Sequence, residues 1–90
     1  MIIVFTRQAQ RDLENIHVYI ARDNPAQAYT VLSKLHTAIN RLADFPEMGR
    51  VGRKPGTREL IVPRLRYRVH YRVRSDRVQI IRVRHTSQND

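Results

Sequence analysis

The sequence has no cysteine, and its apolar runs are short. Without cysteine the chain cannot form a disulfide, a thiol nucleophile or a thiolate metal site, which excludes a secreted disulfide scaffold and a zinc finger. The apolar opening, Met1 to Phe5, is far shorter than the core of a signal peptide or a membrane span. We therefore expect a soluble, cytoplasmic protein that has no membrane partner and needs no metal or cofactor.

Acidic residues are also scarce. Eight Asp and Glu stand against seventeen Lys and Arg, which leaves a formal charge of +9 with the histidines neutral. The 90 residues suffice for one hydrophobic core, so we expect a single domain over residues 1–90. A hydrophobic content of 41% is typical of a globular chain and too high for a disordered one.

The positive charge is concentrated in the second half of the chain. Residues 1–45 carry five basic and four acidic side chains, whereas residues 46–90 carry twelve basic and four acidic ones. Most of the cations are arginines, whose planar guanidinium binds phosphate or carboxylate oxygens in pairs. A surface that is merely solvated usually mixes both signs. The imbalance therefore predicts an anionic partner, either nucleic acid or an acidic protein segment.

The first half predicts a strand and two helices. Ile2 to Phe5 is expected to be a strand buried on both faces, and Thr6 is a candidate N-cap for a helix that runs to about Arg22. Asn24 and Pro25 then supply the cap and first residue of a second helix, which ends before Phe45-Pro46. The apolar stripes of the two helices are Ala9, Leu13, Ile16, Ile20 and then Ala28, Val31, Leu32, Leu35, Ile39, Leu42. Helices joined so tightly should pack as an antiparallel hairpin.

The second half predicts strands. Residues 46–56 contain two prolines and three glycines and are expected to form a mobile loop, followed by a strand over Glu59 to Val62. Residues 66–74 alternate without a fault, with tyrosine and valine on one face and arginine and histidine on the other. Ser75-Asp76 is a two-residue turn, so the last strand, Arg77 to His85, should pair with this one.

The pairing of these last two strands can be predicted in register. Val73 should face Val78, and Tyr71 should face Ile80. The alternation changes phase at Ile80-Ile81, which indicates a β-bulge. Beyond the bulge, the polar face should be rejoined by Arg82 and Arg84, beside Arg68 and His70.

The predicted fold is α+β. An N-terminal strand and an α-helical hairpin precede an antiparallel three-stranded meander (β-α-α-β-β-β), and the helices cover the tyrosine and valine face of the sheet. The opposite face then carries an array of like charges, which costs stability unless an anion binds there. The residues assigned to anion or partner binding are Arg53, Lys54, Arg58, Arg66, Arg72, Arg82 and Arg84.

In its order of elements the sequence resembles the RelE/ParE toxins of bacterial type II toxin–antitoxin systems. The similarity covers Ile2 to about His85. The matching stretches are AQRDLENIHVYI (9–20), Asn24-Pro25 with Ala26 and Ala28, LADFPEMGRVG (42–52), GTRELIV (56–62), YRVHYRV (67–73) and VQIIRVRH (78–85).

The resemblance implies a toxin that inhibits bacterial growth and is neutralised by a cognate antitoxin. It implies that the antitoxin wraps around the toxin and that operator DNA is bound only through the antitoxin, and we expect an acidic, partly disordered segment that contacts an exposed Leu65. Two activities occur on this fold. RelE-like members cleave mRNA on the ribosome, whereas ParE-like members poison DNA gyrase.

Arg68 and His85 bear on the choice between these activities. They match an active-site arginine and a C-terminal acid/base residue of related ribonuclease toxins, and histidine titrates near neutrality. His85 is equally well explained as a residue that caps a strand end. The tail HTSQND is similar to the His-x-Ser ending of ParE-like toxins and has no aromatic ring to stack on a base.

Gyrase inhibition is therefore the favoured prediction. A ribosome-dependent mRNA endoribonuclease is the alternative, and that would be the only case in which the chain is an enzyme. A basic nucleic-acid-binding module is the second alternative, and it predicts an affinity that falls steeply with salt.

Overall fold

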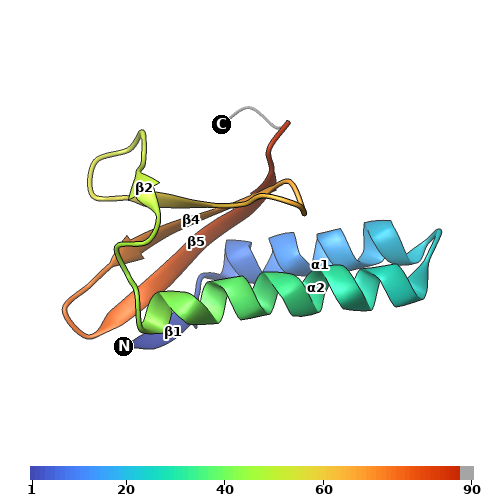
Figure 1. Ribbon diagram of the computed structural model, residues 1–90, viewed down its shortest axis with the longest axis horizontal. Helices are drawn as coiled ribbons and strands as arrows, with labels where there is room; N and C mark the ends of the chain where they lie inside the picture. Colours follow the sequence, from blue (N-terminus) through green and yellow to red (C-terminus); the bar gives the residue numbers. More distant parts are fainter. Residues whose placement is uncertain (88–90) are drawn as a thin grey trace.

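The computed structural model describes residues 1–87, and its elements follow the predicted order of one strand, two helices and a series of strands (Figure 1). Their bounds are β1 Ile2–Phe5, α1 Arg7–Ala21, α2 Pro25–Asn40, a 3₁₀ turn η1 Arg41–Ala43, β2 Arg50–Val51, β3 Arg58–Val62, β4 Tyr67–Val73 and β5 Arg77–His85. The α+β class is confirmed. Among the described residues, no helix combines the length and apolar content needed to cross a membrane.

Both helices begin at the predicted caps. The Thr6 hydroxyl accepts a hydrogen bond from the Ala9 N–H at 3.0 Å, and the Asn24 side chain accepts one from the Gln27 N–H at 3.0 Å. Each cap satisfies a backbone donor that the first turn of a helix leaves without an internal partner. Pro25 occupies the first helical position, where a missing N–H costs nothing. The two helices pack side by side and run in opposite directions, which confirms the predicted antiparallel hairpin (Figure 1).

The sheet has five strands in the order β1-β5-β4-β3-β2. The three strands β3, β4 and β5 form the predicted antiparallel meander, and β1 adds to it in parallel with β5. The prediction that β1 is buried on both faces is wrong. β1 is an edge strand, and Ile2 is 58% exposed. A short apolar run fits an edge strand that packs on one face as well as it fits a central strand.

One face of the sheet forms the hydrophobic core with the helices. Figure 1 shows α1 and α2 together on one side of the sheet. The core is made of buried residues from both layers: Ala9, Leu13, Val31, Leu35, Ile39, Leu42, Val69, Tyr71, Val78, Ile80 and Val83. Tyr67 and Val73 pack against its edge, so the tyrosine and valine side of β4 faces the helices as predicted.

The register of β4 and β5 is also as predicted. Val73 faces Val78 and Tyr71 faces Ile80, and the register shifts between His70 and Tyr71, which leaves Ile81 as the extra residue of a bulge. β4 is shorter than the predicted strand. It begins at Tyr67, because Arg66 lies in the preceding turn with a positive φ of 59°.

The segment between η1 and β3 is not simply a loop, as the prediction had it. Arg50–Val51 form the short strand β2, which pairs with Glu59 and Arg58 of β3. The residues between the two strands close into a hairpin loop, Gly52–Thr57, through a hydrogen bond from the Gly52 N–H to the Thr57 carbonyl at 2.8 Å. In Figure 1 this loop rises on the side of the sheet away from the helices.

The buried tyrosine of β4 holds the start of β2 in place. The Tyr71 hydroxyl donates to the Pro46 carbonyl at 2.7 Å and accepts from the Gly49 N–H at 2.8 Å. A Cβ at Gly49 would lie 2.6 Å from that hydroxyl, so only glycine fits this close approach. Arg58 completes the anchor by donating to the Gly49 carbonyl at 2.8 Å.

Candidate functional site

The side of the sheet opposite the helices carries polar side chains from three strands. On β4, Arg68, His70 and Arg72 alternate with the buried Val69 and Tyr71, so they point away from the core. Strand pairing places Arg84 beside Arg68, Arg82 and Glu59 beside His70, and Gln79 beside Arg72. We call these seven residues the polar face. Its existence confirms the predicted difference between the two sides of the sheet.

A cavity of about 520 Å³ lies on the polar face, against the Gly52–Thr57 loop. We call it the basic cavity. Its lining residues are Thr6, Arg53, Lys54, Thr57, Glu59, His70, Arg72, Gln79, Ile81, Arg82 and Arg84. Five of the residues assigned to anion binding from the sequence therefore come together here: Arg53, Lys54, Arg72, Arg82 and Arg84.

Among the described residues, Glu59 is the one carboxylate that lines this cavity, and it is absent from the predicted site residues. Its side chain is 4% exposed, and its Oε1 lies 3.7 Å from guanidinium nitrogens of both Arg50 and Arg68. A buried carboxylate needs such counter-charges, because transfer out of water disfavours its ionised form. The sequence signal that could have identified Glu59 is the alternation of side chains along β3. Glu59 lies between Arg58 and the half-buried Leu60, so it takes the opposite face to both, and strand pairing places it beside His70.

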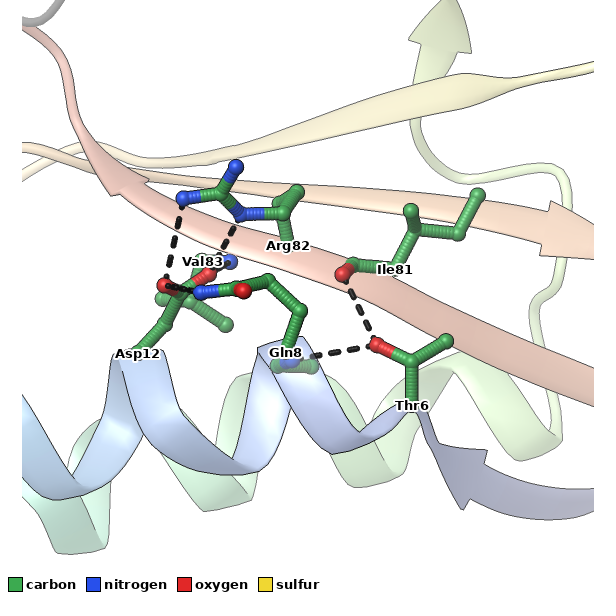
Figure 2. A network of polar contacts seen from close by, with 7 residues as sticks. Thr6, Gln8, Asp12, Ile81, Arg82 and Val83 are labelled. Atoms are coloured by element: carbon green, nitrogen blue, oxygen red, sulfur yellow. Dashed lines mark hydrogen bonds and ion pairs between the residues drawn. The ribbon is translucent and has the colours of Figure 1, made fainter.

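Asp12 is a second acid that is absent from the predicted site residues, and it binds Arg82. Figure 2 shows the Asp12 carboxylate of α1 beneath β5, where it accepts two hydrogen bonds from the Arg82 guanidinium, at 2.8 and 3.2 Å. It also accepts the Val83 N–H at 3.0 Å and a hydrogen bond from the Gln8 side chain at 3.1 Å. Arg82 is thus an internally paired cation that lines the cavity from a fixed position.

These contacts shift the ionisation of Asp12. Burial by itself raises the pKa of this carboxyl, but the hydrogen bonds from Arg82, Val83 and Gln8 outweigh burial and hold its pKa below the ordinary value of 3.8. Asp12 is therefore ionised at neutral pH, and its charge is matched by the guanidinium of Arg82.

Two assigned residues lie elsewhere. Arg58 pairs with Tyr71 on the helix side of the sheet, where its guanidinium is bound to the Gly49 carbonyl, so it does not join the polar face. Arg66 lies in the turn before β4, and its carbonyl accepts the Thr86 N–H at 2.8 Å. The prediction grouped both residues with the other cations, because positive charge alone does not show where a strand begins or on which face of the sheet a side chain lies.

Arg68 and His85 do not share a face. Arg68 pairs with Arg84, whereas His85 pairs with Tyr67, whose ring packs edge-on against the His85 ring at a centroid distance of 5.4 Å. Arg68 donates to the Thr86 carbonyl at 3.2 Å, and His85 Nδ1 lies 2.6 Å from the Ser87 hydroxyl. Part of the tail HTSQND, residues 88–90, lies outside the described residues.

Across residues 1–87, no three His, Asp or Glu side chains gather as ligands of a metal ion would. What the polar face can do chemically is bind an anion: guanidinium groups fixed by strand pairing present a charge that phosphate or carboxylate oxygens would neutralise.

Comparison with known proteins decides the family. A family model described as the ParE toxin of the type II toxin–antitoxin system parDE matches residues 3–90. The chain belongs to the ParE toxin family. The protein Y4kP of Sinorhizobium fredii is 40% identical over 86 residues, covering 96% of this chain and 88% of that protein. Toxin RelE2 of Caulobacter vibrioides is 34% identical over 85 residues, covering 94% of each.

Solved structures give the same fold. The chromosomal ParDE toxin–antitoxin system of P. aeruginosa contains a chain that superimposes with a TM-score of 0.85 at 26% identity, over 97% of both chains. The toxin–antitoxin complex RelBE2 of Mycobacterium tuberculosis gives a TM-score of 0.66 at 27% identity, over 93% of this chain and 95% of that one. This ParE family member is accordingly a toxin of a type II toxin–antitoxin system, and these neighbours support an antitoxin as its partner.

Proposed function

We propose that this ParE family toxin inhibits bacterial growth by binding DNA gyrase, without covalent chemistry of its own. The matched family model is that of ParE, and the resemblance to ParE-like toxins implies gyrase as the target. The chain superimposes better on the matched chain of the P. aeruginosa ParDE system than on the matched chain of the RelBE2 complex, which also favours the ParE-like activity.

The observation that carries the proposal is the separation of Arg68 and His85. Cleavage of RNA through its 2′-hydroxyl needs an acid/base group and a cation that act on the same phosphate. Arg68 lies on the polar face, whereas His85 lies on the other side of the sheet against Tyr67. Two groups on opposite sides of a sheet do not flank one phosphate. This arrangement therefore favours an activity based on binding.

The antitoxin is proposed to be an acidic, partly disordered protein that covers part of this basic chain. Charge complementarity would speed its association and select it over neutral proteins. The predicted contact with Leu65 needs correction, because Leu65 is half-buried and packs against the core. Apolar side chains that are exposed, such as Val51 at 78% and Phe45 at 57%, offer better contacts for an apolar stripe of the antitoxin.

A supercoiling assay tests the proposed target. Purified gyrase, relaxed plasmid and excess toxin should yield reduced supercoiling, and addition of the co-purified antitoxin should restore it. The matched control is the same reaction with the toxin denatured beforehand. Complete supercoiling at excess native toxin would reject the proposal.

Ribosome-dependent mRNA cleavage is the second candidate, and one observation favours it. A relative 34% identical to this chain over 94% of its length carries the name Toxin RelE2. Primer extension on mRNA translated in the presence of the toxin would show cuts at codon boundaries if this activity holds. Intact transcripts together with inhibited supercoiling would reject it.

A further inference from the structure

Gyrase binding assigns no small ligand to the basic cavity, although its walls are suited to one. Arg53 and Lys54 approach it from the Gly52–Thr57 loop, and Arg72 approaches it from β4. Among residues 1–87, none of these three cations forms an ion pair with an acid. Three unneutralised cations around one cavity attract a multiply charged anion.

Arg72 gives the most direct indication of a ligand. Its Nε is buried, and within the described part of the chain it has no hydrogen-bond partner. The Gly52–Thr57 loop covers it, since a Cβ at Gly56 would lie 4.0 Å from this nitrogen. A buried donor without an acceptor is costly. An anion that enters the cavity would supply the missing acceptor.

The lining that β5 contributes to the cavity is partly apolar. The bulge in β5 brings the consecutive residues Ile81 and Arg82 into the same lining, which regular alternation would not allow. Figure 2 shows Thr6 donating to the Ile81 carbonyl, at 2.9 Å, while Asp12 fixes Arg82. The Ile81 backbone is therefore held in place, and the Ile81 side chain adds an apolar surface to the lining of the cavity.

We propose that the basic cavity binds a nucleotide-sized polyphosphate. Its phosphate oxygens would contact Arg53, Lys54 and Arg72, and its organic part would pack on Ile81. The volume of about 520 Å³ lies within the range of small-molecule sites. This site goes beyond the proposed function, because it requires neither gyrase nor antitoxin. A free nucleoside triphosphate and the triphosphorylated end of a nucleic acid share the required chemistry.

Calorimetric titration of the toxin with inorganic triphosphate and with ATP, at constant ionic strength, tests the site. Both should bind saturably at one site per chain, with ATP the tighter because of Ile81. Arg72→Gln should weaken both by about tenfold or more, since it removes a charge-assisted contact. Arg74→Gln removes the same charge from an exposed residue that does not line the cavity, and it should leave both affinities unchanged.

A second pair of variants keeps the test informative if Arg72→Gln does not fold. Lys54→Gln removes a cation that lines the cavity from the loop. Lys34→Gln, the control, removes the same charge from an exposed residue of α2. Lys54→Gln should weaken ATP binding while Lys34→Gln should not, with equal helical circular dichroism for both. Equal losses for cavity and control variants, or no saturable binding by the wild-type chain, would overturn the proposal.

Competition identifies the source of the phosphate. A single-stranded oligonucleotide with a terminal triphosphate and the same oligonucleotide without it are each titrated against bound ATP. Displacement only by the phosphorylated strand supports a site that takes a nucleic-acid end, and displacement by neither supports a free nucleotide. Equal displacement by both, growing with strand length, would indicate general attraction to the polar face and would overturn the proposal. None of these outcomes depends on the gyrase assay.

Discussion

Asp12 is the residue that secures the far half of β5. The pairing of β1 with β5 ends at Phe5 and Ile80, so the Val83 N–H has no strand partner on that edge. Asp12 accepts this N–H and also binds Arg82 (Figure 2). Beyond the end of β1, the Asp12 side chain of α1 thereby accepts a β5 backbone N–H that a neighbouring strand would otherwise bind.

Asp12→Asn tests this role. The variant loses the charge that binds Arg82 and should lower the free energy of unfolding by about 2 kcal/mol, because hydrogen bonds to charged groups are worth more than neutral ones. Glu14→Gln makes the same chemical change at an exposed position of the same helix and should change stability by less than about 0.5 kcal/mol. Urea unfolding at neutral pH measures both, and equal stabilities of the two variants would contradict the role.

The difference in the free energy of unfolding between the wild-type chain and Asp12→Asn should depend on pH, in the direction set by the lowered pKa of Asp12. The pKa of Asp12 is lowered by folding, so its stabilisation is complete above the ordinary value of 3.8 and is lost as the pH falls through the lower folded value. The stability gap between the wild-type chain and Asp12→Asn should therefore be constant near neutrality and should close in strong acid. A gap that widened as the pH fell would contradict the assignment.

Tyr71 is the second residue with a measurable structural role. Tyr71→Phe keeps the ring in the core but removes the hydroxyl that bridges Pro46 and Gly49. We expect a loss of about 1 to 2 kcal/mol in the free energy of unfolding, since the buried Gly49 N–H and the partly buried Pro46 carbonyl lose their partner. Tyr29→Phe, at a 73% exposed position, is the control and should be neutral. Thermal unfolding of both variants at one pH provides the comparison.

At the scale of elements, local signals were sufficient for the helices. The caps Thr6 and Asn24 and the apolar stripes depend only on residues within a few positions, and the structure follows them closely. Asn24→Ala should cost about 1 kcal/mol, because the Gln27 N–H loses its acceptor. Asn40→Ala is the matched control, since the Asn40 side chain makes no capping hydrogen bond. Chemical unfolding that gave equal losses would argue against the cap.

The alternation of β4 and the phase change in β5 predicted the sheet pairing and the bulge, because both are set by the period of the strand. Contacts between distant parts of the chain were not predictable in this way. The ion pair of Asp12 with Arg82 spans 70 residues, and the burial of Glu59 depends on where β2 and β4 place Arg50 and Arg68. The polar face could therefore be predicted from the sequence, but which of its cations form ion pairs with Asp12 or Glu59 could not.

At the scale of the whole molecule, the positive charge is the dominant feature. Of the formal charge of +9, the second half of the chain carries +8, and mutual repulsion of the arginines on the polar face opposes folding. Sulfate or polyphosphate should therefore raise the melting temperature by more than sodium chloride does at equal ionic strength. Scanning calorimetry that found equal shifts for these salts would show that no anion binds specifically.

Induction of the toxin without its antitoxin, followed by growth and by primer extension on host mRNA, tests most directly whether the chain acts by binding. Because His85 lies across the sheet from Arg68, we predict that His85→Ala still arrests growth and that transcripts stay intact in both strains. Codon-boundary cuts with the wild-type chain that disappear, together with the growth arrest, in a folded His85→Ala variant would contradict it.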